Sequence, residues 1–143
     1  MFSTVAVGTD GSQTAGAAIE VATDLARRYG AGLVLLSAFQ DPQRAARWGT
    51  DAFAVAAEWA ASTSAQVREI LARTEADLRG QGVDCTTRVG EGDPADVLVQ
   101  LAEECGADLL VVGNKGMHRR MLGSVPNTVT HKAPCAVLVV KTT

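Results

Sequence analysis

One segment of the sequence gathers the residue types that bind phosphate groups in proteins. Gly113 and Gly116 follow an apolar run, and Gly123 and Ser124 come shortly after them. Glycine lets a backbone turn sharply and approach a ligand closely. We expect a helix to begin near Ser124, and the unpaired N–H groups and dipole of a helix N-terminus attract an anion. Basic residues lie between the two glycine pairs and add positive charge: Lys115, His118, Arg119 and Arg120.

The residues alone leave two interpretations of this segment open. The first is a phosphate-binding loop, which the local excess of positive charge in an acidic chain favours. The second is a solvated basic turn in which the glycines satisfy the backbone geometry and Ser124 is a simple helix cap.

A second candidate follows the first apolar run, in the residues Gly8-Thr9-Asp10-Gly11-Ser12. Asp10 places a carboxylate at the tip of a predicted strand, where it could accept hydrogen bonds from the hydroxyls of a ribose. Aspartate is also a common turn former, so the alternative is an Asx-turn in which Asp10 bonds to its own backbone.

Motifs for other kinds of chemistry are absent from the sequence. The glycine-rich segment is not a Walker loop, and no dinucleotide fingerprint follows the first predicted strand. There is no G-x-S-x-G nucleophile elbow, and neither His118 nor His131 has an evident acidic partner. Cys85, Cys105 and Cys135 form no C-x-x-C pair, which fits buried, reduced thiols better than a metal site. We predict no catalytic residues, no metal ligands and no enzymatic activity.

The hydrophobic pattern supplies the strands and helices that would position these loops. Four runs are apolar almost throughout, as expected of parallel strands covered by helices on both faces: Val5–Gly8, Leu33–Leu36, Asp108–Gly113 and Ala136–Val140. Val83–Val89 alternates instead, which predicts an edge strand with one wetter face. Helical periodicity follows Ser12 as far as a stop at Gly30, spans Val67 to Leu78, lies between Asp93 and Gly106, and runs from Ser124 to Lys132. This alternation predicts an α/β fold with a parallel sheet and right-handed crossovers.

One connection, from Gln40 to Ser62, is longer than the others and contains both tryptophans, Trp48 and Trp59. Long connections are often functional, so it could be a lid or a partner surface. An ordinary helix that packs its tryptophans on the sheet explains the pattern as well.

Composition limits the classes of function. A chain of 143 residues and 14.9 kDa predicts a single domain over residues 1–143. A net charge of −3 and an aromatic content of 4% argue against a nucleic-acid-binding face. We expect no membrane span, since no stretch approaches about 20 apolar residues. The widely spaced cysteines and the lack of a signal peptide predict a cytoplasmic protein.

Taken together, these motifs resemble the universal stress protein family over essentially the whole chain. The resemblance rests on residues 5–12, on Val89-Gly90-Glu91-Gly92-Asp93-Pro94, on residues 108–125 and on the closing run of residues 133–140. It implies a Rossmann-like three-layer sandwich of the adenine nucleotide alpha hydrolase type, with a five-stranded parallel sheet in the order 3-2-1-4-5. It also implies a homodimer formed through the last strand.

The resemblance further implies binding of an adenine nucleotide, namely ATP, AMP or cyclic AMP, and Mg²⁺ could accompany ATP. Gly8, Thr9, Ala38 and Val112 would line the adenine pocket, and Asp10 would bind the ribose. The phosphates and ribose would be approached by Gly113 and Gly116, with the phosphates held by Gly123, Ser124 and Val125. The family motif is G-x2-G-x9-G-[ST], whereas this sequence has six residues between Gly116 and Gly123.

The function predicted in this way is a stress-response or regulatory protein that binds an adenine nucleotide without efficient catalysis. The alternative is a dimeric protein-interaction module with a vestigial nucleotide pocket, in which the segment around Trp48 and Trp59 contacts partners.

Overall fold

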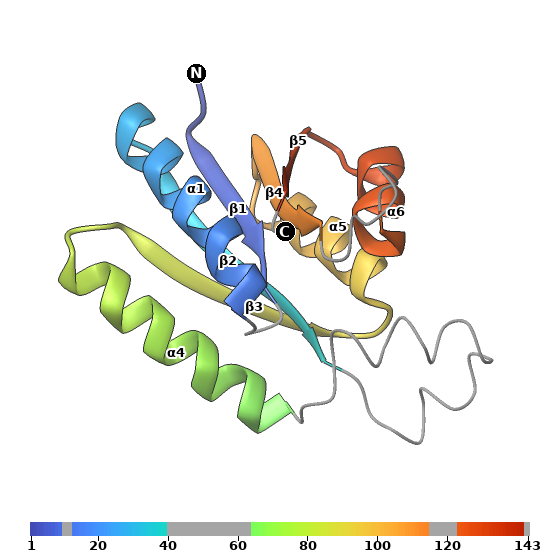
Figure 1. The fold of residues 1–143 in the computed structure, drawn as a ribbon, viewed down its shortest axis with the longest axis horizontal. Coiled ribbons are helices and arrows are strands. Elements are labelled where there is room, and N and C mark those ends of the chain that lie inside the picture. Colours follow the sequence, from blue (N-terminus) through green and yellow to red (C-terminus); the bar gives the residue numbers. More distant parts are fainter. Residues whose placement is uncertain (10–12, 40–63, 115–122, 142–143) are drawn as a thin grey trace.

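The computed structural model describes residues 1–9, 13–39, 64–114 and 123–141. Its strands and helices alternate along the chain (Figure 1). In order they are β1 (Thr4–Gly8), α1 (Gln13–Tyr29), β2 (Gly32–Phe39), α4 (Ser64–Gly80), β3 (Cys85–Glu91), α5 (Pro94–Glu104), β4 (Leu109–Asn114), α6 (Ser124–Lys132) and β5 (Ala136–Lys141). The strands form one parallel sheet in the order β3-β2-β1-β4-β5, which confirms the fold expected from the resemblance.

Two helical layers cover the sheet, one on each face (Figure 1). On one face α1 and α4 pack against alternate residues of the central strands, such as Val5 and Leu35. On the other face α5 and α6 pack against the intervening residues, such as Leu36 and Leu110. Both faces of β1, β2 and β4 are therefore buried, which explains why their sequences are apolar without alternation.

The last strand departs from this pattern. Its sequence is as apolar as that of the central strands, but β5 lies at one edge of the described sheet and alternates between exposed and half-buried side chains. Leu138 is 37% exposed. The expectation of a strand covered on both faces is wrong for β5, because the helices leave the side chains of this edge strand exposed or only half-buried.

The helix boundaries follow the local signals with one correction. Asp93 caps α5 by accepting a hydrogen bond from the backbone N–H of Asp96 at 3.2 Å. Gly106 follows α5 with a positive φ of 68°, a conformation that glycine adopts without a steric cost. The sequence interpretation of Ser124 as a cap is wrong: the N-cap of α6 is Gly123, and Ser124 is the first helical residue.

Contacts at the amino ends of the strands stabilise the edge opposite the predicted site. The carboxylate of Asp108, just before β4, accepts hydrogen bonds from the N–H groups of Ser3 at 2.7 Å and Thr4 at 3.0 Å. These two bonds hold the pKa of the Asp108 carboxyl below its ordinary value. They connect the start of β1 to the start of β4, two segments that are more than 100 residues apart in the sequence.

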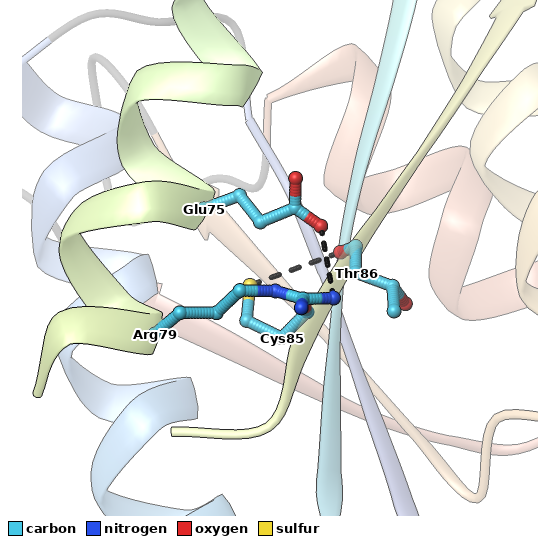
Figure 2. Close-up of polar contacts among 4 residues, drawn as sticks. All are labelled: Glu75, Arg79, Cys85 and Thr86. Atoms are coloured by element: carbon cyan, nitrogen blue, oxygen red, sulfur yellow. Dashed lines mark hydrogen bonds and ion pairs between the residues drawn. The ribbon is translucent and has the colours of Figure 1, made fainter. Parts of the chain in front are cut away.

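A second contact at that edge connects α4 to β3 (Figure 2). Arg79 donates from Nε to the carbonyl oxygen of Cys85 at 2.8 Å, and its guanidinium lies 3.5 Å from the Glu75 carboxylate. Burial raises the pKa of the Cys85 thiol to about 11, so this thiol stays protonated and unreactive at neutral pH. The prediction of buried thiols is confirmed for Cys85, whereas Cys105 and Cys135 are partly exposed.

No helix in the described part of the chain is long and apolar enough to cross a membrane. Nor do the described residues contain a group of three or more His, Cys, Asp or Glu side chains that could hold a metal ion. The Gln40–Ser62 connection, with both tryptophans, lies outside the described residues.

Candidate functional site

The predicted binding residues come together at the carboxyl edge of the sheet. β1 pairs with β2 on one side and with β4 on the other, so the ends of these three strands are adjacent. The direction in which the sheet grows reverses at β1. From β1 the chain adds β2 and β3 on one side, and it then returns to add β4 and β5 on the other side. In open α/β sheets a crevice forms at such a reversal, and ligands bind there.

Eight of the predicted residues lie at this edge within the described part of the chain: Gly8, Thr9, Ala38, Val112, Gly113, Gly123, Ser124 and Val125. Asp10 and Gly116 lie outside the described residues, as do the basic residues Lys115, His118, Arg119 and Arg120. The positive charge of the loop therefore stays a prediction from the sequence.

Burial divides the predicted site into a covered side and an open side. The side chains of Thr9, Ala38, Val112 and Val125 are all buried, and Ala38 and Val112 have no exposed surface. Gly113 and Gly123 are half-buried, and Ser124 is exposed. The apolar residues thus form the floor of this edge, and the open part lies at the end of β4 and the start of α6.

Hydrogen bonds fix the backbone where β1 ends. The N–H of Thr9 donates to the carbonyl oxygen of Leu36 at 2.8 Å, which extends the pairing between β1 and β2 by one residue. The buried hydroxyl of Ser37 then donates to the carbonyl oxygen of Thr9 at 2.7 Å. Both backbone polar groups of Thr9 are therefore hydrogen-bonded to β2. Ser37 is a functional-edge residue outside the predicted set, and its signal in the sequence is a serine inside the otherwise apolar strand β2.

The start of α6 is held in a similar way. The Oδ1 atom of Asn114, the last residue of β4, accepts a hydrogen bond from the N–H of Gly123 at 2.8 Å. Asn114 has no exposed surface. This bond joins the two ends of the glycine-rich loop. No local pattern in the sequence indicates it, because the two residues are nine positions apart.

The geometry at the start of α6 suits an anion. Gly123 has no side chain, so it offers no cap to the N–H groups of the first turn of α6. Pro126 has no N–H, which leaves Ser124 and Val125 as the first-turn donors. These donors and the helix dipole favour a negatively charged group beside Gly113.

A separate groove lies between α1 and α4, away from the predicted site. It has a volume of about 360 Å³ and is lined by side chains of both charges on α1, Glu20, Asp24 and Arg27, and by Leu78 and Gln81. None of the residues that line it belongs to the predicted site.

The chain is similar to known proteins over almost its whole length. The sequence profile of the universal stress protein family matches residues 1–141. The chain belongs to the universal stress protein family. A universal stress protein of Mycobacterium tuberculosis is 37% identical to it over 150 residues, covering 99% of this chain and 98% of the relative. The universal stress protein YxiE of Bacillus subtilis is 28% identical and covers 99% of this chain and 100% of the relative.

Solved structures of the family share the architecture. A universal stress protein in complex with cyclic AMP is 33% identical, with a TM-score of 0.75 and coverage of 99% of both chains. The universal stress protein from Archaeoglobus fulgidus is 22% identical, with a TM-score of 0.69, and covers 99% of this chain and 95% of its own. The second likeness supports the fold alone.

Proposed function

We propose that this universal stress protein binds an adenine nucleotide at the carboxyl edge of its sheet and serves a regulatory, stress-response role without efficient catalysis. One observation carries the proposal: the uncapped N-terminus of α6 is fixed at the end of β4, the strand that pairs with β1 where the sheet order reverses. The cyclic AMP complex of a relative 33% identical over nearly the whole chain supports adenine as the base.

Different predicted residues contact the adenine, the ribose and the phosphates of the ligand. The adenine lies against Gly8, Thr9, Ala38 and Val112, and Asp10 accepts hydrogen bonds from the ribose. The phosphates lie over Gly113 and Gly116 and against the start of α6, at Gly123, Ser124 and Val125. The ligand is ATP, AMP or cyclic AMP, and Mg²⁺ accompanies ATP. No residue among these is placed as a general base for water, so the proposed role is binding.

Isothermal titration of nucleotide-stripped protein with ATP, AMP and cyclic AMP tests this proposal. We expect saturable heat with at least one of them. Gly113→Val is expected to abolish this heat, because a branched side chain would fill the space beside the phosphates. Gly80→Ala is the control: Gly80 ends α4, and an added Cβ there meets nothing within 4 Å. An absence of saturable heat at millimolar nucleotide would contradict the proposal.

We also propose that residues 1–143 form one domain and that two copies pair through β5. The apolar side chains of β5 support this pairing, because an unpaired apolar edge strand is prone to aggregation unless another chain covers it.

Replacing Leu138 with aspartate is expected to convert a dimer into a monomer, because it buries a charge in the proposed interface. Sedimentation velocity measures the change. Ile70→Asp is a matched control, because Ile70 on α4 is 38% exposed and Leu138 is 37% exposed. Equal effects of the two substitutions, or a monomeric unmutated protein, would disprove pairing through β5.

A further inference from the structure

The described residues include four buried polar side chains, and three of the four lie at one end of the sheet: Thr9, Ser37 and Asn114, with Thr23 as the exception. Thr23 bonds to the carbonyl of Ile19 within its own helix at 2.7 Å. The other three lie at or near the carboxyl ends of β1, β2 and β4, and the bonds of Ser37 and Asn114 are made to the backbone of the segments that leave these strands.

A polar side chain without exposed surface costs free energy unless it is hydrogen-bonded. Asn114 has no exposed surface, and its Oδ1 atom accepts the hydrogen bond from Gly123. Its strand neighbours that face α5 and α6, Leu110 and Val112, are both apolar. Packing alone would therefore favour an apolar residue at position 114. What the amide adds is an acceptor oxygen for the N–H of Gly123.

The bond of Asn114 acts on the N-terminus of α6 directly. Gly123 is the N-cap residue, so fixing its N–H fixes the position and direction of the first turn of the helix. The first-turn donors, the N–H groups of Ser124 and Val125, are thereby held at a set distance from the end of β4. A binding group that is already in place before the ligand arrives costs less to order on binding.

We propose that Asn114 is a positioning residue that presets the N-terminus of α6 for the phosphate of the ligand. This inference rests on the proposed function and adds a role for a side chain outside the predicted set. Asn114 acts through Gly123 and does not itself touch the ligand. The amide of Asn114 is neutral, so it supplies the acceptor without adding charge. An aspartate at this position would place a negative charge beside the phosphate.

The test compares a ligand that has phosphates with one that has none. Asn114→Ala and the nearly isosteric Asn114→Leu both remove the acceptor, and the second preserves the buried volume. We expect either variant to weaken ATP binding roughly tenfold while the affinity for adenosine changes less than about twofold. Exchange of the Gly123 amide hydrogen, followed by NMR without ligand, is expected to become faster in both.

Val129→Ala is the matched control, since Val129 is also fully buried and lies later in α6. It is expected to lower stability without changing the ratio of the ATP and adenosine affinities. An equal loss of both affinities in the Asn114 variants, or an unchanged exchange rate at Gly123, would overturn the inference. So would failure of both Asn114 variants to fold while Val129→Ala folds, because Asn114 would then be a core residue alone.

The same titrations separate this inference from the proposed function. If the unmutated protein binds neither ATP nor adenosine, the proposed function is wrong and the inference falls with it. If it binds ATP more tightly than adenosine and the Asn114 variants keep that preference, the inference alone is wrong.

Discussion

Ser124→Asp is expected to weaken ATP binding roughly 10–100-fold without destabilising the fold. Ser124 is the exposed first residue of α6, so the new carboxylate would lie beside the proposed phosphate position. Two like charges about 4 Å apart repel by about 4 kcal/mol at an effective dielectric of 20, and solvent reduces this to about 1–3 kcal/mol. Isothermal titration measures the loss.

The same substitution has the opposite effect on stability, which makes the test specific. An acidic residue in the first turn of a helix interacts favourably with the dipole, by about 0.3–1 kcal/mol. The unfolding free energy of Ser124→Asp should therefore equal or exceed that of the unmutated protein in a urea titration. Ser124→Asn is the neutral control of similar shape, and its ATP affinity should change little. Unchanged ATP binding in Ser124→Asp would contradict a phosphate position at the start of α6.

Leu110→Ala is expected to cause the largest loss of stability, about 2–5 kcal/mol. Leu110 in β4 has no exposed surface and packs in the cluster between the sheet and α5 and α6. Removing its side chain leaves a cavity in a region with few ways to collapse. At roughly 2–4 °C per kcal/mol for a chain near this size, calorimetry should show a fall in Tm of about 4–20 °C.

Leu138→Ala on the neighbouring strand β5 is the control for that prediction. Leu138 is 37% exposed in the single chain, so its truncation should cost less than about 1 kcal/mol in a monomer. If two copies pair through β5, the cost rises with protein concentration, because dissociation then accompanies unfolding. Equal destabilisation by the two substitutions at low protein concentration would contradict the burial described for β4 and β5.

Local sequence signals predicted the elements of this fold well. The apolar runs at Val5 and Leu33 became buried strands, and Asp93 became the cap of α5. These features are determined by residues close to one another in the sequence, so local sequence patterns predict them. The order of the strands depends on pairing between distant segments, and it was expected from the family resemblance alone.

Features that depend on distant partners were not predictable from local patterns. The apolar run of β5 looks like that of β4, yet β4 is buried and β5 is not, because the helices cover both faces of β4 and leave the edge strand partly exposed. The bond from the N–H of Gly123 to Asn114 spans nine residues, and that from the N–H of Ser3 to Asp108 spans 105. Neither the residue type nor the position of Asn114 or Asp108 predicts its hydrogen-bond partner. The roles of the predicted site residues, including Asp10 and Gly116, stay predictions.

The location of the ligand is tested most directly by amide NMR spectra of nitrogen-labelled protein during a titration with ATP. We predict saturable shifts concentrated at the carboxyl edge of the sheet, at Gly8, Thr9, Gly113, Ser124 and Val125. The groove between α1 and α4, lined by residues such as Thr23 and Gln81, should show no such shifts. Saturable shifts confined to that groove, or no saturable shifts at millimolar ATP, would contradict nucleotide binding at the start of α6.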